Sequence, residues 1–292
     1  MFSFVFAKPI ERTKYIMGTY ISIVLPEENK NLFKEAFNIF KEVDNKFSKY
    51  RPDSYVYKLN KNKVEKIDNQ VLDLLKICLD IYRETDGYFD ITLGNFTKKF
   101  GIFYEESYKS SSENLGIENI EIKNDFIYLK NNISLDFGGI GKGYAVDLVA
   151  DFLKKNGISK AVIKASGDIR CLDICYIGIK NPFSEGIIFS FWTKNPETAI
   201  STSGNYERYI GNTKNNHLIN PKTKKSQTLI ASITLISIAN NTYLDAYATA
   251  VSVMPLEKAL NFLDKKDIAY IIFTTDRKKI VSKNICKFIV CN

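Results

Sequence analysis

The sequence predicts an α+β fold in which strands and helices are intermixed, without the regular alternation that builds a parallel α/β sheet. Two hydrophobic patterns support this prediction. In residues 31–48 and 69–84, apolar residues return every three or four positions, as on one face of a helix. The segment Ile268–Thr274 is instead a short run of apolar and β-branched residues, which is typical of a buried strand.

The first half of the chain is expected to open with a strand and to continue with two helices. Tyr20–Leu25 has the character of a strand and follows a turn at residues 17–19. The first helix, 31–48, has an apolar face made by Leu32, Ala36, Phe40, Val43 and Phe47. The second, 69–84, has one made by Val71, Leu74, Leu75, Cys78 and Tyr82. Residues 100–133 are expected to form irregular structure with short strands.

The second half begins with a predicted helix over Ile140–Lys155. Gly157 is well placed to end it, because glycine readily adopts the conformation found at helix C-termini. Two more helices are predicted at 243–253 and 256–264, with Pro255 near the first turn of the latter. Strands are predicted at 160–165, 174–180, 186–193, 197–202 and 228–237.

Composition points to an ordinary globular protein. Of 292 residues, 45% are hydrophobic and 25% are charged, and no apolar run approaches the roughly 20 residues of a membrane helix. The net charge of +8 is spread along the chain. A nucleic-acid binder would gather basic residues on one face with stacking aromatics, so we expect no nucleic acid as partner. The positive charge favours an anionic small molecule such as a dinucleotide.

The five cysteines do not form a zinc motif, because the chain has no CxxC pair and a single histidine. They are interpreted as buried thiols, with disulfides Cys171–Cys175 or Cys286–Cys291 left open. Residues 1–16 are interpreted as an N-terminal segment, a candidate remnant of an export signal, and residues 17–292 as a single domain. The apolar start of this segment lacks the basic region of a complete signal peptide.

A glycine-rich segment at residues 136–144 precedes the predicted helix at Ile140–Lys155. Four glycines fall within six residues there. Glycine lets the backbone approach a ligand closely, and a helix N-terminus offers unpaired N–H groups to a phosphate. The spacing matches neither a Walker loop nor a Rossmann fingerprint. The segment is therefore either a phosphate-binding loop or a tight structural turn.

Asp245 and Thr249 are four residues apart on a predicted helix, so their side chains share one face. A carboxylate and a hydroxyl are hard oxygen ligands that suit Mg²⁺. The alternative is an Asp that caps the helix and a Thr packed in the core.

His217 is the only histidine and lies in a polar segment that resembles a loop. Its ordinary pKa lies near neutrality, so it is a candidate for proton transfer or a structural residue. Two aromatic loops follow the first two helices. Tyr50 in one of them, and Tyr88 with Phe89 in the other, either stack on a planar ring or serve packing.

Taken together and in order, eight segments resemble the FAD:protein FMN transferases, the ApbE-like flavin transferase family. The resemblance runs from residue 17 to about residue 265. The matching segments are MGT at 17–19, FSKYRPDS at 47–54, TDGYFDIT at 85–92, DFGGIGKGYAVD at 136–147, ASGDI at 165–169, STSGNYER at 201–208, HLINP at 217–221 and DAYATA at 245–250.

The resemblance implies a T-fold-like architecture with mixed or antiparallel sheets, and helices packed around a central flavin cleft. By position, it assigns Mg²⁺ to the Gly139 carbonyl, Asp245 and Thr249, and proton transfer to His217. The residues that it assigns to the flavin are Met17, Tyr50, Tyr88, Phe89, Asp90, Asp136, Lys142 and Ile219. Three positions depart from the family pattern, namely Ser166 and Lys224 at common glycines and Asn220 at a common aspartate.

The function implied by the resemblance is Mg²⁺-dependent transfer of the FMN half of FAD to a Thr or Ser hydroxyl of an acceptor protein, with release of AMP. The acceptor would carry an Asp and an Ala-Thr or Ala-Ser pair. Two rival functions use the same site: a pyrophosphatase that hydrolyses FAD to FMN and AMP, and a protein that binds FAD without reacting. Members of the family commonly act outside the cytoplasm, so the resemblance also implies an exported protein, periplasmic or attached to the cell envelope through an N-terminal anchor.

Overall fold

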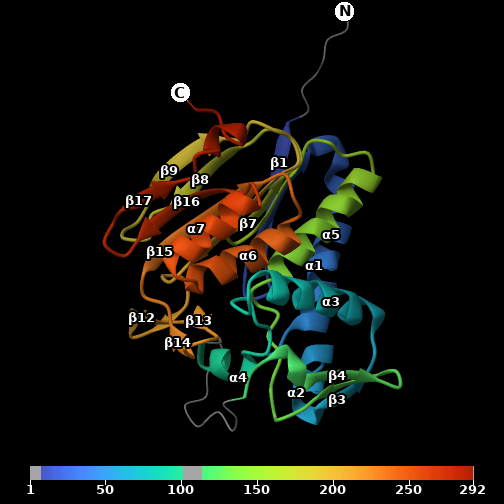
Figure 1. Ribbon diagram of the computed structural model, residues 1–292. Coiled ribbons are helices and arrows are strands. Elements are labelled where there is room, and N and C mark those ends of the chain that lie inside the picture. Colours follow the sequence, from blue (N-terminus) through green and yellow to red (C-terminus); the bar gives the residue numbers. More distant parts are fainter. Residues whose placement is uncertain (1–7, 101–113, 292) are drawn as a thin grey trace, which may run out of the picture.

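The protein is built on an eight-stranded sheet, and the α+β prediction is confirmed (Figure 1). The computed structural model describes residues 8–100 and 114–291. Every neighbouring pair of strands in the main sheet is antiparallel. In spatial order the strands are β1 (Pro9–Ile16), β2 (Thr19–Pro26), β6 (Val162–Ala165), β7 (Asp168–Cys171), β10 (Thr198–Gly204), β15 (Ile230–Ser237), β16 (Ala269–Thr274) and β17 (Lys279–Val281).

Helices cover one face of this sheet and enclose the larger core. Figure 1 shows α5, α6 and α7 packed against the strands. Strand residues such as Ile21, Ile23 and Ile163 point into this core and are fully buried. The helices are α1 (Phe33–Phe47), α3 (Asn69–Glu84), α5 (Gly141–Lys155), α6 (Asn241–Val253) and α7 (Leu256–Lys265).

The predicted helices form because their apolar faces and end signals agree. The buried residues of α1 are Phe33, Ala36, Phe37, Phe40, Val43 and Phe47, which recur at the spacing of one helical face. Asp68 caps α3 by accepting a hydrogen bond from the Val71 N–H at 3.1 Å. Gly157 adopts a φ of +76° just after α5, as the sequence predicts. Pro255 directly precedes α7.

A hairpin of β8 (Tyr176–Lys180) and β9 (Ile187–Trp192) covers part of the other face of the sheet. Inward residues of the hairpin, such as Ile177 and Phe191, meet a smaller core with residues of β10, β15 and β16. A disulfide between Cys171 and Cys175 joins the hairpin to β7, and Cys286 pairs with Cys291 near the C-terminus. Cys78 is a free, buried thiol.

A smaller lobe extends below the main sheet in Figure 1. It holds α2 (Tyr55–Asn62), α4 (Gly94–Thr97) and the sheet β3–β5–β4, whose strands span Val64–Lys66, Phe126–Leu129 and Ile120–Lys123. Two short hairpins follow β10 in the chain, β11 with β12 (Tyr209–Ile210, Asn212–Asn216) and β13 with β14 (Ile219–Asn220, Lys225–Ser226).

The sequence analysis missed several elements, among them β1, β7 and α2. Strand β1 comes from residues assigned to the N-terminal segment, and it is a mostly exposed edge strand without a hydrophobic pattern. The interpretation of residues 1–16 as part of an export signal stays a prediction, and residues 1–7 lie outside the described residues. Strand β7 has four residues, of which two are charged, and α2 has eight. Within the described ranges, no helix is both long and apolar enough to span a bilayer.

Candidate active site

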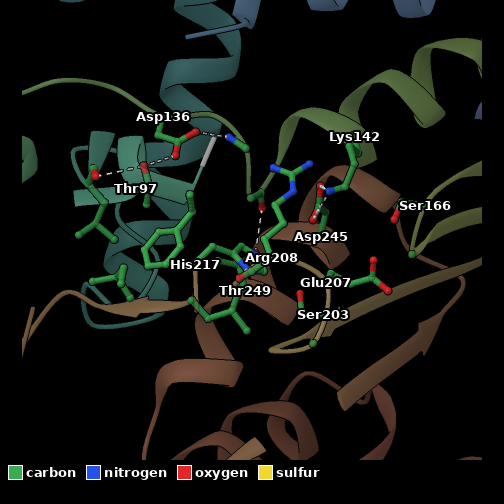
Figure 2. A pocket seen from close by; sticks show the side chains of 18 of the residues that line it. Thr97, Asp136, Lys142, Ser166, Ser203, Glu207, Arg208, His217, Asp245 and Thr249 are labelled. Atoms are coloured by element: carbon green, nitrogen blue, oxygen red, sulfur yellow. Dashed lines mark hydrogen bonds and ion pairs between the residues drawn. The ribbon is translucent and has the colours of Figure 1, made fainter. Parts of the chain in front are cut away.

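A cavity of about 280 Å³ lies between one end of the main sheet and the smaller lobe. Three segments of the sheet contribute to its wall: the β1–β2 turn at Gly18, the β6–β7 turn at Ser166 and Gly167, and the end of β10. Figure 2 shows side chains from both parts of the chain pointing into this space.

Eleven of the twelve residues predicted from the sequence line this one cavity. They are Tyr50, Tyr88, Phe89, Asp90, Asp136, Gly139, Lys142, His217, Ile219, Asp245 and Thr249. The exception is Met17, although Gly18 and Thr19 beside it do line the cavity. Met17 adopts a φ of +56° in the β1–β2 turn, and its Cε lies 3.8 Å from the Cβ position of Gly141.

The glycine-rich segment is required first for helix packing. A Cβ on Gly143 would lie 2.2 Å from the Asn241 carbonyl oxygen, so this glycine lets α5 touch α6. A Cβ on Gly139 would lie 2.8 Å from the Thr249 Oγ1, also on α6. Positive φ is not needed at any glycine from 138 to 143. The glycines therefore serve close packing against α6. Phosphate binding by the segment stays a prediction.

This packing brings three oxygen groups to the start of α5. The Thr249 hydroxyl donates to the Gly139 carbonyl at 3.4 Å, and Asp245 lies one turn earlier on α6. The Gly143 N–H donates to Asp245 Oδ2 at 3.1 Å. Among the described residues, no group of three His, Cys, Asp or Glu side chains could hold a metal. A cation at this point would therefore have one carboxylate and two neutral oxygens as ligands.

Lys142 shares its ammonium between two buried carboxylates. Its Nζ lies 3.0 Å from Asp168 Oδ2 and 3.3 Å from Asp245 Oδ2. Burial, and next the nearby charge of Asp245, raise the pKa of Asp168 to about 7, although Lys142 opposes this. Burial disfavours charge on Lys142, but both carboxylates together hold its pKa above the ordinary value. Ser201 on β10 donates to Asp168 Oδ1 at 2.6 Å.

A second ion pair lies on the side of the smaller lobe. Lys49 Nζ is 2.6 Å from Asp136 Oδ2, and Thr97 Oγ1 donates to the same oxygen at 2.5 Å. Burial opposes charge on Asp136, but Lys49 and the hydrogen bonds lower its pKa to about 2. Lys49 also lies 5.1 Å from the centre of the Tyr50 ring. The pair therefore fixes the position of one of the predicted aromatic residues.

His217 lies between β12 and β13, and its ring is held by a neighbouring loop. Its ring Nδ1 is 3.1 Å from the Arg208 carbonyl oxygen, and the backbone N–H of His217 donates to the same oxygen. Burial, followed by the positive charge of Arg208, lowers the pKa of His217 to about 4. The imidazole is therefore neutral near pH 7. With its proton on Nδ1, the imidazole would donate a hydrogen bond to the Arg208 carbonyl, and Nε2 would be free to accept another proton.

The aromatic residues come from the two loops that the sequence singled out. Phe89 is buried, whereas Tyr50 and Tyr88 are partly buried at the cavity wall. Asp90 is occupied within its own turn, where its Oδ1 accepts from the N–H and the hydroxyl of Thr92. Lys258 lies 4.8 Å from the centre of the Tyr88 ring, on the outer side of the site.

Sequence reasoning missed several residues that shape the site. Lys49, Asp168 and Arg208 stand inside segments that the resemblance had already matched, but no role followed from their spacing. Thr97 gave no sequence signal. Two departures from the family pattern have a structural setting, because Ser166 and Lys224 replace glycine at φ values of +58° and +57°. Asn220 Nδ2 donates to the Val253 carbonyl at 2.8 Å, so its amide serves the fold.

Comparisons with known proteins agree with this architecture. The model of the ApbE family matches residues 17–272. The FAD:protein FMN transferase of Vibrio cholerae is 25% identical over 263 residues, 82% of this chain and 78% of the relative. That of Buchnera aphidicola is 26% identical and covers 91% of this chain and 86% of its own.

Solved structures share the fold. The crystal structure of the ApbE protein from Thermotoga maritima superposes with a TM-score of 0.86 at 25% identity, over 96% of this chain and 99% of that one. The flavin transferase ApbE from Vibrio cholerae gives a TM-score of 0.81 at 24% identity, over 97% and 99% of the two chains. The order of the eight matched segments, the antiparallel sheet and the extent of the family match lead to one assignment: this chain belongs to the ApbE family.

Proposed function

We propose that the protein transfers the FMN half of FAD to a Thr or Ser hydroxyl of an acceptor protein, with release of AMP. One observation supports this most strongly. A neutral histidine, a partly buried lysine and the oxygen groups of Gly139, Asp245 and Thr249 all line a cavity that also has aromatic walls. A flavin dinucleotide needs such a combination, because it has a flat ring system at one end and a charged pyrophosphate in the middle.

The two halves of the cavity suit the two parts of this substrate. Tyr50 and Tyr88 offer ring faces at the end near the smaller lobe. Lys142 and the N-terminus of α5 offer positive charge and N–H groups at the other end, where the pyrophosphate would bind. The names of the relatives, FAD:protein FMN transferase, support the same substrate.

The residues around Asp245 fit a magnesium ion. They supply a carboxylate, a hydroxyl and a backbone carbonyl, which are the hard oxygen ligands that Mg²⁺ prefers alongside substrate phosphates. Asp168 adds a second negative charge next to Asp245. When bound there, the ion would neutralise charge on the phosphate oxygens during transfer.

The chain's own residues would carry the rest of the reaction. The acceptor oxygen forms a bond to the phosphorus on the riboflavin side, the bond from that phosphorus to the bridging oxygen breaks, and AMP leaves with the electron pair. His217 Nε2 takes the proton of the attacking hydroxyl. The negative pyrophosphate would offset the charge of Arg208 and raise the pKa of His217 toward the range of an effective base.

The test is to mix the protein with FAD, Mg²⁺ and a synthetic peptide that carries an Asp and an Ala-Thr pair. We expect one FMN to be added to the peptide and one AMP to be released for each turnover, as measured by mass spectrometry and chromatography. The variant His217→Gln should lower the rate by about 10²–10⁴-fold. Equal AMP release without peptide would indicate the pyrophosphatase instead, and intact FAD would indicate a protein that only binds it.

We also propose that the protein works outside the cytoplasm. Its four paired cysteines support this, because structural disulfides persist in oxidising compartments. Thiol alkylation of protein taken directly from its native cells should label only Cys78 after unfolding. Labelling of all five cysteines would contradict the proposal.

A further inference from the structure

A second groove of about 230 Å³ adjoins the candidate active site. Its walls come from strand β8 and from the end of the main sheet. Four residues, Ser166, Gly167, Thr202 and Glu207, line both the groove and the cavity. Its lining includes four isoleucines, Ile169, Ile177, Ile179 and Ile200, which also belong to the smaller core between the hairpin and the sheet. Through the four shared residues, the groove ends at the reacting centre.

One side of the groove is a strand edge with free backbone groups. Within the described residues, β8 is hydrogen-bonded to β9 alone. The Thr193 N–H donates to the Cys175 carbonyl at 2.9 Å, which sets the alternation of the ladder. By that alternation, Ile177 faces β9, whereas the backbone N–H and C=O of Gly178 point away from β9. Gly178 and Lys180 both line the groove.

The far wall of the groove is the loop that positions His217. Lys180 Nζ lies 3.4 Å from Glu207 Oε1 and 5.4 Å from the centre of the Tyr206 ring. The next residue, Arg208, holds the imidazole of His217 through its carbonyl. A molecule in the groove would therefore contact the same short loop that orients the proposed base.

We propose that this groove binds the acceptor protein as an extended segment. The segment lies along β8, makes backbone hydrogen bonds to its free edge, and passes Ser166 and Gly167 so that its hydroxyl residue reaches the cavity. An extended chain is the partner whose own N–H and C=O groups match a strand edge. The inference rests on the proposed transfer of FMN to a protein hydroxyl.

The strand edge is tested with two substitutions at one position. Gly178→Pro removes the outward N–H, and Gly178→Ala is the matched control, because both add a Cβ beside the Ile187 side chain. With the Asp and Ala-Thr peptide as probe, we expect Gly178→Pro to raise the KM of the peptide about tenfold over Gly178→Ala. The kcat at saturating peptide and the Kd for FAD should stay the same in both.

The positive charge of Lys180 in the wall of the groove allows a second, independent test. Lys180→Glu should raise the KM of the peptide that carries Asp, and lower the KM of a peptide in which this Asp is replaced by Lys. Lys123→Glu, an exposed lysine of the smaller lobe, is the control and should change neither.

Each failure has a separate signature. If the wild-type protein adds no FMN to the peptide, the proposed function itself is overturned. If the wild type is active, but Gly178→Pro matches Gly178→Ala and Lys180→Glu leaves both KM values unchanged, the docking groove alone is overturned.

Discussion

Two clusters of aspartate and lysine at the site differ in one respect; Figure 2 labels Asp136 of the first, and Lys142 and Asp245 of the second. Asp136 has Lys49 to itself, and the pKa of that carboxyl falls to about 2. Asp168 and Asp245 share Lys142, and the pKa of Asp168 rises to about 7. Both sites are buried, so the ratio of carboxylates to ammonium groups accounts for the opposite shifts.

The difference suggests a division of work. The pair Lys49–Asp136 is electrically complete, so its role is to hold structure, including the ring of Tyr50. The cluster around Lys142 has one more negative than positive charge when both carboxylates are ionised. A buried excess of negative charge is costly unless a cation joins it, which is the condition that favours Mg²⁺.

The largest expected effect comes from removing the carboxylate nearest the other oxygen ligands. Asp245→Ala should abolish Mg²⁺-dependent turnover, a loss of at least about 10³-fold, because a catalytic ion contributes several kcal/mol to the transition state. The measurement is AMP release against Mg²⁺ concentration with FAD and peptide. Rates like those of the wild type would remove the proposed metal site and with it the contrast between the clusters.

The ion pair between Lys49 and Asp136 should contribute mainly to the stability of the protein. Lys49→Met leaves the Asp136 carboxylate without its cationic partner, which we expect to cost about 3–5 kcal/mol in the free energy of unfolding. Urea denaturation measures this cost. The double variant Lys49→Met with Asp136→Asn is the control and should recover most of the loss. If the single and double variants are equally stable, the pair does not hold this wall.

A smaller effect is expected when the shared cluster is converted into a simple pair. Asp168→Asn removes one carboxylate and keeps an oxygen for the Ser201 hydroxyl. The affinity for Mg²⁺ should fall about 10–100-fold, as for other residues that support a metal ligand. Titration calorimetry in the presence of FAD measures it, with Asp173→Asn, at a partly exposed position, as control. An unchanged affinity would separate Asp168 from the proposed metal site.

The smallest effect concerns acid stability. The folded-state pKa of Asp136 is about 2, below its ordinary value of 3.8, so its ion pair stabilises the protein above pH 3.8. This contribution, about 2 kcal/mol, should be lost as the pH falls from 3.8 toward 2. Thermal unfolding of the wild type and of Asp136→Asn should therefore converge in this window. Curves that stay parallel would mean that the pKa is not lowered.

The sequence predicts those parts of the fold whose pattern is local. The apolar stripe of α1 and the β-branched run of β16 carry their structure in their own residues. The edge strand β1 lacks such a pattern because most of its side chains are exposed, and its structure depends on pairing with β2. In β7, the inward residues Asp168 and Arg170 are charged, and their burial is explained only by partners distant in the chain, which include Lys142 and Asp147 on α5.

The residues of the site also differ in whether a local sequence pattern predicts them. Asp245 and Thr249 could be paired from sequence because one helical turn separates them. Lys142 was matched as a flavin residue, but its link to Asp168 depends on the packing of α5 against β7. Lys49 and Asp136 are 87 residues apart in the chain, so nothing in their spacing indicates an ion pair.

The absence of a side chain at Gly143 affects how the groups of this site are held together. Because α5 and α6 touch there through backbone atoms, the distance between the glycine-rich segment and α6, which carries Asp245, is set by the thickness of two main chains. Their contact is also part of the larger core. The same contact between α5 and α6 thus holds both the hydrophobic interior and the groups of the proposed reaction centre in place.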